Sequence, residues 1–366
     1  MNANFKNFRI MKKSFRYIVL SLVLLLGVSA PKAFAGNEDR SGQAGAPELL
    51  INPFAASAGW GNAGMSFVKG VEAMFGNVAG ISTINSLDVN FSHTDWLKGS
   101  DVKISSFGLT IRVSESGVLG LSFFTLNPGT IKETTTDSPD GNGATFKPSL
   151  MHIGVAYAKM FSNSISGGFN LKIISESIAN MSATGVALDA GIQYVTGPFD
   201  NIHFGITLKN IGPTMTFSGD GLAFKAYFNT NSSLQWTVIQ RADQFELPTQ
   251  LSIAAAYDFH FAETHRLTLA GNFISNSFTR DQYVAGIEYS WREWLLLRTG
   301  YVFESGIFKG VLDDDCMNLN KGLHAGCSIQ VPISKKENAP VIAIDYAFRQ
   351  TYSYQGSHSV GARLIF

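Results

Sequence analysis

The chain has 366 residues, of which 15% are charged, 12% are aromatic and 36 are glycine. The formal net charge is zero, so the composition gives no reason to expect nucleic acid or a strongly acidic partner. Few charges and many aromatic residues are also unlike the Ala-, Glu-, Lys- and Leu-rich composition of long helical proteins.

The first 35 residues are typical of a cleaved export signal. A basic start, an apolar core and a small-x-small cleavage site follow one another as Lys12, Lys13 and Arg16, then 18–28, then Ala33-Phe34-Ala35 before Gly36. The apolar core of about a dozen residues is shorter than the roughly 20 that a spanning helix needs. The sequence therefore predicts export with removal of residues 1–35, and a retained anchor helix is the alternative.

The next part of the chain, residues 36–84, is predicted to be an N-terminal extension that contains a lumenal plug. Within it, residues 47–84 carry a glycine every few positions, which favours tight turns and close approach of the backbone to its neighbours. Such a segment is either a periplasmic linker or a plug, and its many apolar side chains favour the plug. The predicted plug residues are Asn52, Pro53, Gly59, Gly61, Gly64, Met65, Asn77, Ala79 and Gly80.

From residue 86 to the end, apolar residues alternate with polar or small ones, as in β-strands. In the clearest run, Val186 and Ile192 share one face, and Asp189 and Gln193 share the other. About fourteen such segments predict an all-β, transmembrane antiparallel barrel over 85–366, with a soluble β-sandwich as the alternative. The predicted strands are 86–97, 101–113, 117–126, 149–161, 164–176, 183–195, 201–211, 247–260, 265–276, 282–291, 294–304, 321–332, 340–350 and 357–366.

The lengths of the connections indicate which way the barrel faces. The long connections, 127–146, 212–246 and 305–320, are all odd-numbered, whereas the even-numbered ones are short turns. Bacterial barrels have short periplasmic turns and longer extracellular loops. The sequence therefore predicts an outer-membrane protein with both termini periplasmic and with the aromatic Phe366 as its barrel-assembly C-terminus.

The two faces of the predicted strands differ in chemistry. Charges of both signs are expected on the inner face, at Lys172, Asp189, Lys209, Asp258, Glu288, Arg298, Asp345 and Arg363. Mixed signs favour compensating ion pairs over a selectivity device for one charged solute, and abundant inward glycine and alanine indicate a lumen filled by another segment. Aromatic residues expected to point outward into interfacial girdles are Trp96, Tyr157, Tyr194, Trp291 and Tyr301.

The plug segment also carries a family resemblance. The runs AGWGNAGMS (58–66) and VEAMFGNVAGI (71–81) resemble the start of the PorV/PorQ family of Bacteroidetes outer-membrane proteins. That family is similar to FadL-type fatty-acid transporters, in which a glycine-rich lumenal hatch precedes a fourteen-stranded barrel. Where both families usually have Asn-Pro-Ala-Gly, this chain has Asn77-Val78-Ala79-Gly80, so the rigid proline turn is absent.

The resemblance implies a place near type IX protein secretion, in which PorV-like members bind the large translocon barrel and receive cargo that bears a sorting domain. The main hypothesis is therefore a non-enzymatic partner or cargo-shuttle barrel, and the alternative is FadL-like transport of hydrophobic small molecules. The candidate partner-binding residues are aromatic and lie in the 212–246 loop: Phe224, Tyr227, Phe228, Trp236 and Phe245. The alternative is that this loop folds over its own barrel.

No pattern in the sequence points to an enzyme or a cofactor. The histidines are scattered, and no catalytic, metal-binding or phosphate-binding motif is present. Asp313-Asp314-Asp315 lacks the alternating ligands of a Ca²⁺ loop, so a solvated acidic tip is favoured over a cation site. Cys316 and Cys327 either form a disulfide in an oxidising periplasm or remain two free thiols.

Overall fold

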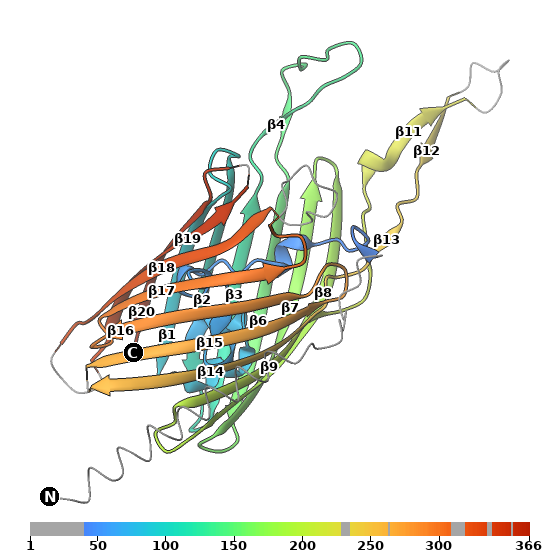
Figure 1. The fold of residues 1–366 in the computed structure, drawn as a ribbon. Coiled ribbons are helices and arrows are strands. Elements are labelled where there is room, and N and C mark those ends of the chain that lie inside the picture. The colour runs from blue at the N-terminus through green and yellow to red at the C-terminus, as the bar shows by residue number, and fades with distance from the viewer. Residues whose placement is uncertain (1–39, 228–234, 263, 309–318, 335–338, 353) are drawn as a thin grey trace, which may run out of the picture. The chain divides into compact units, whose positions relative to one another are not determined.

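The structure, a computed structural model, describes residues 40–227, 235–262, 264–308, 319–334, 339–352 and 354–366. It contains a closed barrel of fourteen antiparallel strands in which the first strand pairs with the last (Figure 1). In order around the barrel the strands are β1 (Leu87–Trp96), β2 (Val102–Arg112), β3 (Gly117–Asn127), β6 (Ser149–Met160), β7 (Ile165–Ile178), β8 (Met181–Thr196), β9 (Ile202–Ile211), β14 (Gln250–Ala262), β15 (His265–Asn276), β16 (Gln282–Trp291), β17 (Leu295–Glu304), β18 (Asn320–Pro332), β19 (Val341–Thr351) and β20 (Ser357–Ile365). The predicted barrel is thereby confirmed, and the largest difference in a strand start is at β14, predicted from 247 and observed from Gln250.

Alternation along each strand separates an apolar outer face from a packed inner face. On β8, Ile192 is exposed on the outer face and its neighbour Gln193 is buried on the inner face. Closure gives every strand two neighbours, so no backbone edge is left unpaired at membrane depth. No helix within the described residues is both long enough and apolar enough to cross a membrane.

One of the predicted outward aromatic residues faces the other way. Tyr157, Tyr194, Trp291 and Tyr301 lie on the outer face, as expected. Trp96 instead has the same parity as the buried Asn90, Ser92 and Thr94 on β1, and its ring lies under the Arg349 guanidinium, 5.1 Å away, inside the barrel. The prediction was wrong because it used the position of Trp96 at a strand end and not its parity.

The connections make the two ends of the barrel different. The long connections β3–β6, β9–β14 and β17–β18 lie at one end, here called the loop end, where small two-stranded sheets extend the wall. These sheets are β4 (Ile131–Lys132) with β5 (Thr145–Phe146), β10 (Met215–Thr216) with β13 (Gln244–Phe245), and β11 (Ala223–Ala226) with β12 (Trp236–Ile239). The other end, the turn end, holds Phe366, whose carbonyl accepts from Ser86 N at 3.1 Å.

Inside the barrel lies the hatch, residues 47–84, which crosses the lumen as a series of short helical turns. These are η2 (Pro47–Leu50), α2 (Ala55–Ala58), η3 (Ala63–Ser66), η4 (Gly70–Met74) and η5 (Val78–Thr83). Phe54, Val71, Phe75 and Ile81 of the hatch pack with buried side chains of β2, β3 and β6 in one apolar cluster. Residues 40–46 precede the hatch and are called the strap.

Close packing of the hatch depends on glycines of the inner wall. A Cβ atom added at Gly300 would lie 2.2 Å from the carbonyl oxygen of Trp60, and one added at Gly326 would lie 2.8 Å from Gly59 Cα. Both distances are far inside van der Waals contact, so only glycine lets the hatch backbone approach the wall this closely.

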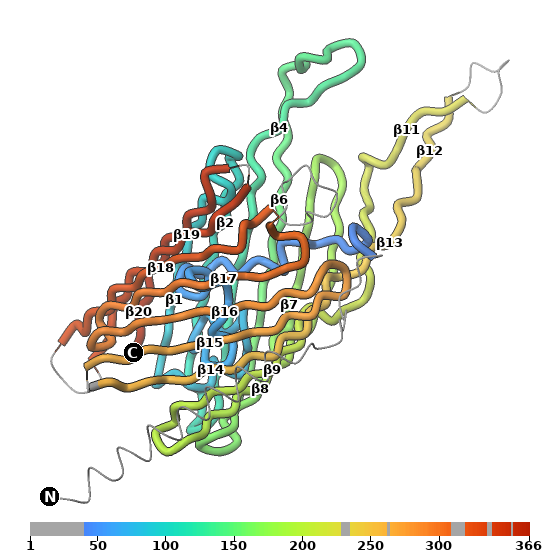
Figure 2. Tube along the Cα trace, viewed as in Figure 1, coloured from blue at the N-terminus to red at the C-terminus, as the bar shows by residue number. Residues whose placement is uncertain are grey.

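The chain enters the described structure at the loop end. Ala44 forms a parallel bridge with Glu246, in the connection that leads into β14, and Gly45 N donates to Glu246 O at 3.0 Å. Figure 2 shows the start of the described chain, in blue, beside β13. The strap lies at the end opposite Phe366, because the hatch traverses the lumen from loop end to turn end before β1 begins. The N-terminus itself falls outside the described residues, so the periplasmic location of both termini stays a prediction.

Replacement of Gly300 by Ala is expected to lower the free energy of unfolding by about 1–3 kcal/mol, because the new methyl group overlaps the hatch backbone. Gly271→Ala is the matched control, since a Cβ atom there meets nothing closer than 3.8 Å. Chemical denaturation of both variants in detergent measures the difference. Equal stability of the two variants would contradict the close hatch–wall contact.

Candidate functional site

A cavity of about 400 Å³ lies between the hatch and the loop end. It is lined by the hatch below and by inner-face side chains of β14 to β19 around it. Its size falls at the lower end of the range for pockets that hold drug-sized ligands. The cavity is therefore the candidate functional site.

The floor of the cavity is apolar and firmly supported. Met65 and Phe75 of the hatch line it. The Phe75 ring meets the ring of Phe54 edge-on at 5.2 Å and lies 6.3 Å from the ring of Phe124 on β3. Such aromatic packing fixes the floor, so the cavity is closed toward the turn end in this conformation.

One wall of the cavity, here called the amide wall, consists of Gln250, Asn272, Asn276 and Gln282 on β14, β15 and β16. Hydrogen bonds hold each amide in place. Gln250 Nε2 donates to Asn276 Oδ1 at 2.9 Å, and Asn276 Nδ2 donates to Arg280 O at 2.8 Å. Gln282 Nε2 donates to Glu304 Oε2 at 2.7 Å, and Asn272 Oδ1 accepts from Ser252 Oγ at 3.0 Å.

Two cationic side chains in the lining hold the hatch. Lys209 Nζ donates to Phe75 O at 2.8 Å. The Arg349 guanidinium donates to Asn52 O and stacks over the Trp96 ring. Both cations thus satisfy hatch carbonyls that short helical turns leave without an intrahelical partner.

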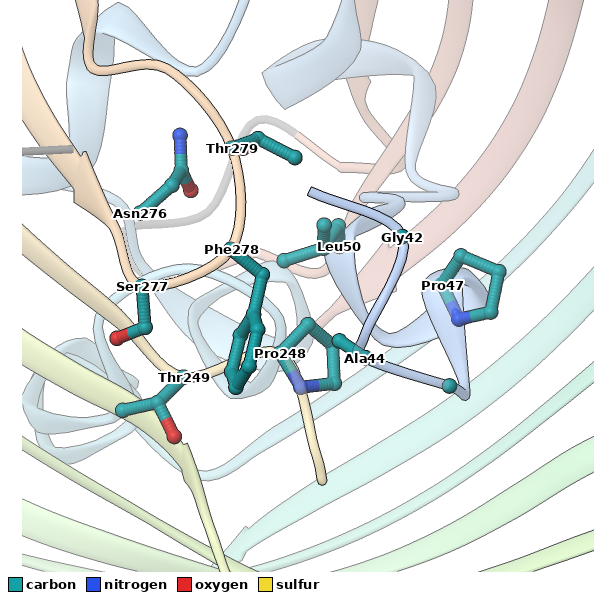
Figure 3. Close-up of a pocket in the computed structure, with 11 residues that line it drawn as sticks. Gly42, Ala44, Pro47, Leu50, Pro248, Thr249, Asn276, Ser277, Phe278 and Thr279 are labelled. Carbon is teal, nitrogen blue, oxygen red and sulfur yellow. The ribbon is translucent and has the colours of Figure 1, made fainter. Parts of the chain in front are cut away.

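A second, smaller cavity of about 100 Å³ lies between the strap and the outer ends of β14 and β15. Figure 3 shows the Phe278 ring beside Pro248, with Leu50 of the hatch close by. Pro47 and Leu50 line both cavities. The start of the hatch is therefore the partition between them.

The strap is attached to the loop end by its first described residue. The Arg40 guanidinium pairs with Glu246 and lies 4.3 Å from the centre of the Phe278 ring. The carboxylate of Glu246 is about half exposed, so the ion pair alone contributes little. The strap is thus held by an exposed contact at Arg40, whereas η2, which follows it, is held by buried contacts.

The most unusual of these buried contacts joins two carboxyl groups. Glu48 of η2 is 1% exposed and faces Glu176 on the inner face of β7. Burial, with the negative charge of Glu176 adding to it, raises the pKa of Glu48 to about 8. A protonated Glu48 is therefore favoured while the strap and η2 are docked.

The inner face of the barrel carries the predicted charges of mixed sign, at the turn end and also beside the cavity. Arg266 Nη1 lies 3.0 Å from Glu288 Oε1 and 3.6 Å from Asp258 Oδ1, and Arg298 pairs with the second oxygen of Glu288. Lys172 and Asp189 form a separate pair at 2.8 Å. Asp345 accepts from Ser328, and Arg363 lies on the same inner face of β20. The charges compensate one another, as the sequence predicted.

The structure places the predicted plug residues together inside the barrel. Asn77 is fully buried; its Nδ2 donates to Ile192 O at 2.9 Å, and its Oδ1 accepts from Ala79 N at 3.2 Å. These bonds hold the corner where the resembling families have a proline. The remaining predicted plug residues also lie in the hatch or at its contacts with the wall: Asn52, Pro53, Gly59, Gly61, Gly64, Met65 and Gly80.

The predicted partner-binding residues divide into two groups. Phe224, Tyr227 and Trp236 are 51%, 61% and 59% exposed on and beside the β11–β12 sheet. Phe245 instead packs against Phe217, 5.6 Å between ring centres, and over Gly45 of the strap. Phe228 lies outside the described residues.

The predicted disulfide and the acidic tip also involve residues that the structure does not describe. Cys327 lies half-buried on β18, but Cys316 and Asp313-Asp314-Asp315 fall outside the described residues. The bridge therefore stays a prediction.

Sequence reasoning missed the amide wall, the strap and Trp96. The alternation that located β15 also places Asn272 and Asn276 on the inner face, so the same pattern could have predicted these inward amides. No local signal marks the strap, because its contacts are with residues about two hundred positions away.

No protein-family model and no curated protein matches the sequence. Solved structures do match. The toluene transporter TodX of Pseudomonas putida aligns with a TM-score of 0.52 and 13% identity, over 86% of this chain and 97% of that one. A TodX mutant described as a monoaromatic hydrocarbon channel aligns with a TM-score of 0.52 and 12% identity, over 85% and 97%.

At this level of identity the matches show a shared fold. The chain shares the closed transmembrane barrel fold of these outer-membrane proteins. In this chain the hatch precedes the first strand of the barrel. The resemblance to the PorV/PorQ family is not tested by these matches and stays a prediction.

Docking of the strap and η2 is expected to weaken as pH rises. A docked Glu48 has a pKa of about 8 and a solvated one has the ordinary value of 4.5, so the docked state binds more protons between these values. Docking is strongest below pH 4.5, falls by up to about tenfold per pH unit, and levels off above pH 8.

Hydrogen exchange of residues 40–50 at pH 5 and pH 8.5 measures this change. Glu48→Gln should remove most of the pH dependence, because a neutral amide replaces the titrating group. Glu246→Gln, at the exposed end of the strap, is the control and should retain it. Equal exchange at both pH values in the unaltered protein would exclude the mechanism.

Proposed function

We propose that this protein admits small molecules with substantial apolar surface into the cavity at the loop end and passes them through the barrel across an outer membrane. The observation that carries the proposal is the cavity of about 400 Å³ on the loop side of a hatch that otherwise fills the lumen. Bacterial barrels place their longer connections outside the cell, so the cavity faces the medium. The role proposed for the hatch is that of a gate.

The apolar part of the lining supports this choice of solute. Met65, Phe75, Trp96, Ile274 and Ile307 contribute to the cavity, which lies beneath the outer connections. Burying apolar surface against such groups is favourable by roughly 25 cal/mol per Å². The fold shared with TodX, which is described as a toluene transporter, also supports the proposal.

Passage requires that the hatch move, because it closes the floor of the cavity. A cross-link from the hatch to the wall tests this. A Cβ atom at Gly361 on β20 would lie 3.6 Å from Ala55 Cβ in α2, which matches the Cβ separation in disulfides. Ala55→Cys with Gly361→Cys, in a background with Cys316→Ser and Cys327→Ser, should therefore form a bridge.

The measurement is the uptake of the apolar fluorophore N-phenyl-1-naphthylamine by intact cells that produce the barrel. The oxidised double-cysteine variant should take up the fluorophore no faster than cells without the barrel, and reductant should restore the rate. The cysteine-free parent controls for effects of the oxidant. Uptake that is equal in the cross-linked and reduced forms would exclude a moving hatch.

A second candidate function is the partner role near type IX secretion that the PorV/PorQ resemblance implies. It is favoured by the aromatic side chains of Phe224, Tyr227 and Trp236, which are exposed at the loop end. Exposed aromatic residues that cluster on one sheet are typical of protein-binding surfaces. The proposed partner is a translocon barrel or a cargo protein with a sorting domain.

Serine at all three positions should reduce co-purification of that partner from native outer membranes by at least tenfold, since aromatic anchors dominate such interfaces. Ile131→Ser on β4, an exposed apolar residue of another loop-end sheet, is the control and should leave the yield unchanged. Recovery of the barrel alone from unaltered membranes would contradict the partner role.

A further inference from the structure

We infer that the cavity selects amphiphiles whose polar part is neutral and rich in hydrogen-bonding groups, such as hydroxyls or amides. The inference rests on the proposed function, because it names the class of molecule that the same cavity admits. The inference is carried by the amide wall and by the charged groups of the lining, which are already hydrogen-bonded within the protein.

The amide wall is a built surface. Gln250, Asn272, Asn276 and Gln282 come from three neighbouring strands and all line the cavity. Hydrogen bonds to one another, to backbone carbonyls and to the Glu304 carboxylate orient them, and each of these bonds uses one of the two N–H groups of its amide. The wall therefore keeps both donors and acceptors for a ligand, in fixed positions.

An apolar ligand against this wall would be penalised. Covering a primary amide with hydrocarbon removes its water and returns no hydrogen bond, which is unfavourable. A hydroxyl or an amide of the ligand returns those bonds. A site built to hydrogen-bond its ligand rejects analogues without the matching group by larger factors than an apolar pocket achieves.

The charged groups of the lining are already engaged by the protein. Lys209 is bonded to Phe75 O, Arg349 is bonded to Asn52 O and stacked on Trp96, and Glu304 accepts from Gln282. A charged ligand would have to compete with contacts that hold the hatch. This favours a neutral polar group over a carboxylate.

The apolar part of the ligand has a place as well. Met65 and Phe75 form the floor, and Val302 and Ile307 lie on the β17 side. A molecule with an apolar body and a neutral polar head can thus contact the floor and the amide wall at the same time.

Calorimetric titration of residues 36–366 in amphipol with n-hexyl β-D-glucoside, hexanoate and n-hexane tests the inference. The alkyl parts are similar in size, so the head group decides. The glucoside should bind at least tenfold more tightly than the other two. Tighter binding of hexanoate would assign the cavity to anions, and tighter binding of hexane would assign it to hydrocarbons; either result overturns the inference.

Gln250→Leu and Gln282→Leu should each weaken binding of the glucoside about tenfold, the value of one hydrogen bond, and should leave hexane unchanged or tighter. Gln330→Leu, on the inner face near the turn-end terminus of β18 and outside the cavity lining, is the matched control and should change neither. Unaltered circular dichroism shows that the variants fold, and unaltered glucoside affinity in both amide variants would overturn the inference.

The outcome is separable from that of the proposed function. Selective binding of the glucoside in a barrel whose cross-linked and reduced forms take up solute equally would retain the ligand class and exclude passage past a moving hatch. Unselective binding in a barrel whose uptake the cross-link blocks would retain passage past a moving hatch and exclude the ligand class.

Discussion

The backbone of the hatch imposes the constraint on which the rest of the lumen depends. Turns of four to six residues leave many carbonyl groups without intrahelical partners, and a filled lumen offers little water to satisfy them. The wall supplies the donors instead: Asn170 to Met74 O, Gln193 to Val68 O, Asn272 to Asn62 O, and Ser92 to Pro53 O. The polar inner face is therefore as much a complement to the hatch as a lining for solute.

Glycine residues on the wall are the second feature that fits the barrel to the hatch. Donors can reach hatch carbonyls only if the two backbones are close, and Gly205, Gly300 and Gly326 provide that closeness on three strands. A barrel of this strand number would otherwise enclose a wider lumen. The sequence of the wall therefore determines what fills the lumen. Larger inward residues would either exclude the hatch or hold its carbonyls away from the donors of the wall.

Much of the fold follows from local patterns, and much of the site does not. Alternation at period two located all fourteen strands, since membrane depth imposes it on every one of them. Glycine spacing marked the hatch for the same local reason. Trp96 shows the limit, because the position of an aromatic residue in a strand does not say which face it takes. The pairing of Glu48 with Glu176, or of Arg40 with Phe278, depends on how the hatch crosses the closed barrel, and no local pattern encodes that path.

The strap and the hatch are one continuous stretch of chain that lines both cavities, and this continuity has a mechanical consequence. Pro47 and Leu50 line both cavities, and the chain that leaves them passes through Asn52, which Arg349 holds, to the floor at Met65 and Phe75. The first turn of the hatch and the floor therefore line the same cavity, where one molecule could contact both. Displacing either one moves backbone whose carbonyls are bonded to wall donors, so those bonds must be broken or exchanged. If the hatch is the gate that we propose, a cavity ligand with its own donors and acceptors would lower the cost of that exchange, whereas an inert hydrocarbon would not. The proposed gate and the proposed ligand class thus depend on the same polar inner face.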